Sequence, residues 1–106
     1  MKASGLDRLF KPHSIAVIGA STDPLKAGHV IVRHLLAGQF KGPILPVTPC
    51  NKSIAGVLAY PDIASLPLTP DLAIICTRRE RVLPLLEALG QKGAGAVIIL
   101  AADFSP

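Results

Sequence analysis

The sequence contains no tryptophan, one tyrosine and three phenylalanines among its 106 residues. Proteins that bind single-stranded nucleic acid usually stack its bases on aromatic side chains, so this shortage argues against a nucleic-acid partner. Lys and Arg residues outnumber Asp and Glu residues by 11 to 7, for a formal net charge of +4, but they form no basic run. The charge balance therefore favours a small anionic ligand of nucleotide size over a polymer.

Cysteine is also scarce, and the two cysteines, Cys50 and Cys76, stand far apart. They form no C-x-x-C motif and no spacing typical of metal ligands, which argues against a disulfide framework and a metal site. Cys76 ends an apolar run, so we expect a small core residue there. The sequence shows neither a signal peptide nor an apolar span of about twenty residues, and we expect a cytoplasmic chain with no membrane partner.

The most informative stretch runs from Ser14 to Ser21, where four apolar residues lead into Gly19. Ile15–Ile18 is typical of a strand buried on both faces, and Ala27–Ala37 has the apolar spacing of a helix. A full G-x-G-x-x-G fingerprint would need glycine where Ser21 and Pro24 stand. A plain strand-to-helix turn without a ligand therefore stays open, beside an anion site at the helix amino terminus.

The rest of the chain alternates further strands with helices. We expect one domain over residues 1–106: an α/β, Rossmann-like, doubly wound parallel sheet of strand order 3-2-1-4-5. Such a fold usually continues with another helix, so we expect a chain truncated after strand 5, the amino-terminal part of a longer protein. The uncovered edge of strand 5 suggests self-association.

Besides Ile15–Ile18, the expected strands are Ile44–Val47 (frayed or bulged at Pro46), Val57–Ala59, Asp71–Cys76 and Ala96–Ala101. The other expected helical segments are Leu6–Phe10, a turn within Pro61–Pro67, and a helix from about Glu80 that carries Pro84 early and is stopped by Gly90 and Gly93.

This strand order puts the ligand crevice at the carboxyl ends of strands 1 and 4. Three loops meet there: Gly19–Ser21, Thr48–Lys52 and Cys76–Arg79. An NAD site would need an acidic residue after strand 2, but none occurs between Asp23 and Asp62. Lys52 suits a phosphorylated ribose, that of coenzyme A or of NADP, while a solvated lysine remains the alternative.

Four segments resemble the CoA-binding domain of NDP-forming acyl-CoA synthetases, and most closely the amino-terminal region of bacterial synthetase-like protein lysine acetyltransferases. They are Lys11–Ser21, Pro46–Pro49, Pro61–Pro67 and Pro70–Ile75. The resemblance implies coenzyme A or acyl-CoA as the ligand. An NAD(H)- or NADP-binding sensory module and a structural domain without ligand are the alternatives.

The resemblance also implies a set of binding residues. Gly19, Ala20, Ser21 and the loop through Lys26 would wrap the CoA phosphates, and the Thr48–Pro49 loop would bring Lys52 to the phosphoadenosine. Cys76, Thr77 and Arg78 would border the adenine and pantetheine. Arg78 and Arg79 depart from the proline and alanine that are frequent in such synthetases, and they either contact phosphate or face solvent.

No catalytic residue is expected in this chain, because the phosphohistidine of the resembling ligases lies in a later domain. His13 precedes the first strand and points away from the site, and His34 is expected on the surface. His29, in the first helical turn, either approaches a phosphate or is solvated. Ser21 lacks a histidine and an acid at triad spacing and is expected to donate a hydrogen bond to a phosphate. Alone, the chain is expected neither to form acyl-CoA nor to acetylate lysine.

Overall fold

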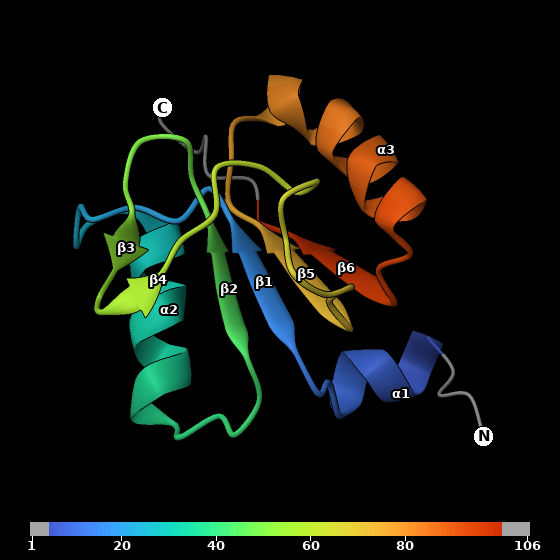
Figure 1. Cartoon of the computed structure of the whole chain (residues 1–106), viewed down its shortest axis with the longest axis horizontal. Coiled ribbons are helices and arrows are strands. Elements are labelled where there is room, and N and C mark those ends of the chain that lie inside the picture. Colours follow the sequence, from blue (N-terminus) through green and yellow to red (C-terminus); the bar gives the residue numbers. More distant parts are fainter. Residues whose placement is uncertain (1–4, 101–106) are drawn as a thin grey trace.

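The computed structural model describes residues 5–100 of the chain. Its centre is a parallel sheet of four strands in the order β2-β1-β5-β6 (Figure 1). These strands are β1 (Ile15–Ile18), β2 (Ile44–Val47), β5 (Leu72–Ile75) and β6 (Ala96–Ile99). The remaining elements are α1 (Gly5–Phe10), α2 (Ala27–Ala37), β3 (Ser53–Ile54), β4 (Val57–Leu58), the 3₁₀ turn η1 (Arg79–Arg81) and α3 (Val82–Lys92). The α/β, Rossmann-like class predicted from the sequence is confirmed.

The strands are aligned in register, so their carboxyl ends form one common edge. Ile15 pairs with Ile44 on one side and with Leu72 on the other, and Leu72 pairs with Ala96. All four residues of β1 are buried, as its unbroken apolar sequence predicts for a central strand. Gly19 therefore emerges in the middle of the carboxyl edge, between the ends of β2 and β5.

Alternate residues of the strands pack into two layers, one on each face of the sheet. On one face Val17 packs with Val32 of α2, Leu9 of α1 and Ile54 of the β3–β4 hairpin. On the other face, Ile18 packs with Leu89 of α3 and with the segment between β4 and β5. Figure 1 shows this segment crossing in front of the sheet, with α2 behind it.

The two long helices have ends that follow from their sequences. Helix α2 spans Ala27–Ala37 as predicted, and Gly38 caps it. Helix α3 tolerates Pro84 because this residue lies in the first turn, where its missing N–H has no intrahelical partner. Gly93, with a φ of 93°, ends α3 in the left-handed conformation. The expectation that Gly90 also stops the helix is wrong, since Gly90 lies inside α3.

The second strand neither frays nor bulges at Pro46, contrary to expectation. Pro46 pairs in register with Val17, and its carbonyl accepts the N–H of Tyr60 on the outer side of β2. Proline is tolerated because β2 is the edge strand of the sheet, so no neighbouring strand needs the missing donor.

The predicted third strand pairs elsewhere. Val57–Leu58 forms β4, an antiparallel partner of β3, while Ala59 lies outside it. Within residues 5–100, only Tyr60 continues the parallel sheet beyond β2, through a single bridge to Val47. The order 2-1-4-5 of the other strands is as predicted, with β5 and β6 as the fourth and fifth strands.

The stretch 61–67 forms no helix but a single hydrogen-bonded turn of four residues, Ile63–Leu66. Ser65 donates its N–H to Asp62 Oδ1 at 2.8 Å, and Leu66 donates to the Ile63 carbonyl. Ile63 and Leu66 are buried against the sheet, so two apolar anchors hold this segment without a helix.

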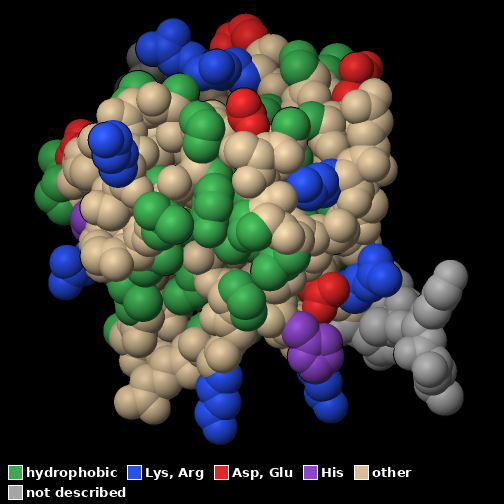
Figure 2. All heavy atoms as spheres, viewed as in Figure 1, with side chains coloured by type: hydrophobic (Ala, Val, Ile, Leu, Met, Phe, Trp, Pro, Cys, Tyr) green, Lys and Arg blue, Asp and Glu red, His purple; other side chains and the backbone are tan. Residues whose placement is uncertain are grey.

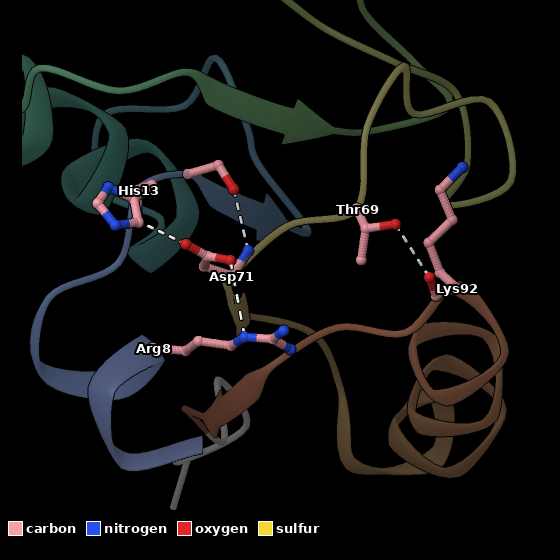
Figure 3. A network of polar contacts seen from close by, with 6 residues as sticks. Arg8, His13, Thr69, Asp71 and Lys92 are labelled. Carbon is pink, nitrogen blue, oxygen red and sulfur yellow. Dashed lines mark hydrogen bonds and ion pairs between the residues drawn. The ribbon is translucent and has the colours of Figure 1, made fainter. Parts of the chain in front are cut away.

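At the amino edge of the sheet, side chains connect distant parts of the chain (Figure 3). Asp71 accepts the His13 backbone N–H at 2.8 Å and lies 3.9 Å from Arg8 Nε. Ser14 Oγ accepts the Asp71 N–H, and Lys92 Nζ donates to the Leu66 carbonyl. His13 is thus at the edge opposite the predicted site, as expected.

The last strand ends at Ile99, and the predicted extension to Ala101 lies outside the described residues. Ile99 is 46% exposed, so the edge strand β6 is only partly covered by the described chain. None of the helices within residues 5–100 has the length and apolar character needed to span a membrane.

Candidate functional site

A cavity of about 430 Å³ opens at the carboxyl edge of the sheet. Its floor is formed by the ends of β1 and β2, and its walls by the start of the β4–β5 segment and by α3. The lining is mostly apolar, and its polar members are Asp62, Thr77 and Arg81. The other lining residues are Ile18, Gly19, Val47, Pro49, Pro61, Ile63, Ala64, Leu85 and Ala88.

Figure 2 shows hydrophobic side chains gathered in the middle of the face presented in Figure 1, with most Lys and Arg side chains around its margin. An apolar cavity with Arg81 in its lining suits a ligand that has both an apolar body and negative charge.

Gly19 is required by the geometry of the turn after β1. Its φ of 87° disfavours any residue with a side chain, and a Cβ here would collide with the Cys76 carbonyl and lie 2.8 Å from Thr77 Cγ2. The glycine therefore lets the β1 turn pass directly against the end of β5, which keeps the cavity floor compact.

Gly28 allows a second close approach, between the start of α2 and the same turn. A Cβ at Gly28 would collide with the Gly19 carbonyl and lie 2.9 Å from Ala20 Cα. The amino terminus of α2 is thus held against the end of β1, the position that carries the phosphate in nucleotide-binding α/β folds. The first turn of α2 contains no acidic residue, and no side chain caps it.

The backbone N–H groups near this turn differ in their availability. Those of Gly19 and Ala20 donate to the Val47 carbonyl, at 3.0 and 3.3 Å. They are therefore occupied in this structure, and Ala20 is also buried in the core. By contrast, the N–H groups of Ser21, Thr22, Ala27 and Gly28 donate to no other residue within the described chain. Ser21, Thr22 and Ala27 are at least partly exposed, whereas Gly28 is buried. N–H groups without partners beside the positive end of a helix dipole are the kind of donor set that binds a phosphate or diphosphate.

The loop between Ser21 and Lys26 is ordered by its own hydrogen bonds. Ser21 Oγ accepts the Asp23 N–H at 3.0 Å, Asp23 Oδ1 accepts the Leu25 N–H, and the Asp23 carbonyl accepts the Lys26 N–H. The Ser21 hydroxyl donates no hydrogen bond to another residue of the described chain, and its bond to a phosphate stays a prediction. Lys26 is exposed directly before α2.

The remaining predicted residues of this edge are distributed around the cavity. Pro49 and Thr77 line it. Thr48 is buried beside it, and its Oγ1 accepts the Cys50 N–H at 3.3 Å. Lys52 and Arg78 are exposed and lie outside the lining.

Cys76 does not reach the cavity. Its side chain packs with Val32 on the α2 face of the sheet, and burial raises the pKa of the thiol from 9.0 to about 11. Alternation along β5 explains this, because Leu72, Ile74 and Cys76 point to the face opposite that of Ala73 and Ile75. Cys76 contributes to the turn through its backbone carbonyl, next to Gly19.

Sequence reasoning singled out Arg78 and Arg79 but missed Arg81, the arginine that lines the cavity. It also missed Asp62, whose carboxylate is already engaged by the Ser65 N–H. The helical spacing of Arg81, the last residue of η1, with Leu85 and Ala88 of α3 could have indicated one shared face. The sequence alone does not predict which face of α3 lines the cavity, because this depends on how the helix packs against the sheet.

The fold, and the free N–H groups beside the amino terminus of α2, are those of a nucleotide-binding α/β domain. The CoA binding domain family matches residues 13–106, so the chain belongs to this family.

Curated relatives agree with this family. The chain is 38% identical over 100 residues to a trans-feruloyl-CoA synthase from an unknown prokaryotic organism, covering 94% of the chain and 14% of the relative. It is 39% identical over 99 residues to the alpha subunit of an ADP-forming acetate–CoA ligase of Pyrococcus furiosus, covering 93% and 21%. The chain thus spans about a fifth or less of the length of these relatives.

A solved structure shows the same fold. An acetyl-coenzyme A synthetase of Ca. Korarchaeum cryptofilum, in complex with phosphate and ADP, superposes with a TM-score of 0.88 at 36% identity. The match covers 93% of this chain and 21% of that one. The chain is a CoA-binding domain of the kind found in NDP-forming acyl-CoA synthetases, and coenzyme A or acyl-CoA is its ligand.

Proposed function

We propose that the domain holds the diphosphate of coenzyme A on the free N–H groups of the Ser21–Lys26 loop and of the α2 amino terminus. The observation that carries this proposal is the donor set itself: Ser21, Thr22, Ala27 and Gly28 present N–H groups without partners among the described residues, beside an acid-free helical turn. Gly19 and Ala20 serve as the close-packed base of this site and not as its donors.

The cavity beside this loop suits the uncharged parts of the ligand. Its apolar lining, including Pro49 and Leu85, fits adenine or the pantetheine arm, and Thr77 offers a hydroxyl. Lys52, Lys26 and Arg78 provide positive charge near the same edge, and we assign the 3′-phosphate to Lys52. Bound coenzyme A would supply a thiol for thioester formation, while the residues of this chain bind and orient it.

A melting experiment tests this assignment. A ligand that binds only the folded state stabilises it by RT ln(1 + [L]/Kd), about 2.7 kcal/mol at a hundredfold excess over Kd. Coenzyme A should therefore raise the melting temperature clearly, dephospho-CoA less, and NAD least. If NAD stabilises the chain more than coenzyme A does, the proposed mode of recognition is wrong.

Substitution of Lys52 then tests whether this lysine binds the 3′-phosphate of coenzyme A. Lys52→Ala should weaken coenzyme A binding roughly three- to tenfold, a discounted value because the lysine is exposed, and leave dephospho-CoA nearly unchanged. Lys41→Ala is the matched control, because Lys41 is an exposed lysine that precedes β2 at the amino edge. If Lys52→Ala and Lys41→Ala have the same affinities for coenzyme A and for dephospho-CoA, the role assigned to Lys52 is refuted.

The parent protein of this domain is proposed to form acyl-CoA thioesters, since the relatives described above are CoA ligases and synthases. A protein lysine acetyltransferase parent stays a prediction from sequence resemblance. Assays of the full-length protein for nucleotide-dependent CoA ligation and for lysine acetylation would separate the two. The isolated domain is predicted to do neither reaction.

Self-association through the β6 edge also stays a prediction. The exposed fractions of Ile99 and Leu100, 46% and 38%, support it. Light scattering should detect dimers at high concentration, and Ile99→Lys should reduce them. A monomer at all concentrations would contradict the prediction.

A further inference from the structure

His29 differs from the other two histidines of the chain, because its side chain is buried. Only 8% of the residue is exposed, whereas His13 and His34 are exposed. It occupies the third position of α2, next to Gly28. Its Nδ1 lies 2.8 Å from the carbonyl oxygen of Ser21. A carbonyl oxygen can only accept a hydrogen bond, so Nδ1 carries a proton and donates it.

This hydrogen bond sets the direction of a complete peptide group. In a planar trans peptide the C=O and the following N–H point in opposite directions, and the described chain contains no cis peptide bond. Because the Ser21 carbonyl points toward the buried imidazole, the Thr22 N–H points away from it. That N–H is one of the donors without a partner among the described residues.

The other side-chain hydrogen bonds of the loop are local and do not connect it to the helix. The hydrogen bond from the Asp23 N–H to Ser21 Oγ and the one from the Leu25 N–H to Asp23 Oδ1 each join residues two positions apart. The His29 bond spans eight residues and joins the beginning of the loop to α2. Without it, the Ser21–Thr22 peptide could rotate and turn its carbonyl oxygen, which repels phosphate, toward the ligand.

We propose that His29 is a positioning residue that keeps the Thr22 N–H directed at a phosphate of coenzyme A. This inference rests on the proposed function, because it assigns the phosphate to the Ser21–Lys26 loop. The imidazole does not touch the ligand; it acts through the Ser21 carbonyl. Thr22 is the residue whose backbone makes the contact.

Three variants test the proposal. His29→Ala removes the donor, and His29→Asn restores an N–H near the position of Nδ1 although its side chain is also smaller than that of histidine. His34→Ala is the matched control, since His34 is an exposed histidine of the same helix. Circular dichroism and melting curves first establish that each variant folds.

Binding of coenzyme A and of inorganic pyrophosphate is then measured by calorimetry. His29→Ala should weaken both by roughly tenfold, the order expected when one hydrogen-bonding partner is removed. His29→Asn should stay within about threefold of the wild type, and His34→Ala should not differ from it. A purely structural role predicts equal losses for His29→Ala and His29→Asn, and that result would overturn the proposal.

Amide spectra supply a readout that does not depend on affinity. The Thr22 amide resonance should shift on addition of coenzyme A in the wild type and in His29→Asn, but not in His29→Ala. In the free protein, the Asp23 and Leu25 amides should exchange at least tenfold faster in His29→Ala. Unchanged exchange in that variant would overturn the positioning role, whatever the affinities.

The two measurements also separate this inference from the proposed function. If the wild type binds neither coenzyme A nor pyrophosphate, the phosphate assignment fails, and the inference that Thr22 contacts phosphate fails with it. If the wild type binds both but the Thr22 amide does not respond, the proposed function survives and the inference is overturned.

Discussion

The two edges of the same sheet are held together in different ways. At the amino edge, Asp71 accepts from His13, which is 58 positions away in sequence, and lies near Arg8, so side chains cross-link separate segments. At the carboxyl edge the close contacts are between backbones, at Gly19 and Gly28, and several N–H groups remain without partners among the described residues. At the amino edge side-chain hydrogen bonds join separate segments, whereas at the carboxyl edge these N–H groups stay without partners among the described residues.

This difference indicates how a small domain can combine stability with binding. A buried polar group without a partner is costly, so free donors are tolerated only where solvent or a ligand can reach them. Substitutions at the two edges should consequently have different effects on stability and on affinity.

The largest effect is expected at Gly19. Gly19 and Gly56 have almost the same φ, 87° and 86°, but a Cβ at Gly56 would meet nothing within 4 Å. Gly56→Ala should therefore cost only backbone strain, about 1 kcal/mol of unfolding free energy. Gly19→Ala should cost more than about 3 kcal/mol, because its Cβ also collides with the Cys76 carbonyl. Urea unfolding measures both, and equal losses would show that the backbone contact at this edge is not tight.

A smaller effect is expected at the amino edge. Asp71→Ala removes the acceptor of the His13 N–H and the partner of Arg8, and should lower the unfolding free energy by about 1–2 kcal/mol. Its affinity for coenzyme A should stay within twofold of the wild type. Glu87→Ala, at an exposed acid of α3, is the control and should change stability by less than about 0.5 kcal/mol. Loss of affinity without loss of stability in Asp71→Ala would contradict the separation of the two edges.

The smallest effect concerns the two cysteines near the carboxyl edge. Cys50 is exposed, whereas burial raises the pKa of the Cys76 thiol to about 11. At pH 8 a thiol reagent should therefore modify Cys50 rapidly and Cys76 only after unfolding. Cys50→Ser should remove the rapid phase. A rapid phase that persists in this variant would show that Cys76 is accessible.

The same pKa predicts a dependence of stability on pH. The thiol ionises near 9.0 in its reference state and near 11 in the fold, so above pH 9 the unfolded chain binds fewer protons than the native one. The contribution of Cys76 to stability is hence constant below pH 9 and falls as the pH rises toward 11. The difference between wild type and Cys76→Ser across this range measures it.

Local sequence patterns were sufficient to predict most of the elements. The apolar run Ile15–Ile18 indicated a central buried strand, and the spacing of apolar residues predicted α2 with its observed bounds. These features depend on neighbouring residues and on the period of each element. The same locality explains the errors, because the behaviour of Pro46 and of Val57–Leu58 depends on which strand lies beside them.

The sequence by itself determined the central strand, the glycine turn after it, and the absence of an acid where an NAD site would need one. Only the tertiary structure decided which donors are free, because Val47, distant in sequence, occupies the N–H groups of Gly19 and Ala20. It also decided that Arg81 borders the cavity and that Cys76 faces away from it. The physical reason is that hydrophobic period is encoded within each segment, whereas the partner of a polar group depends on how separate segments pack together.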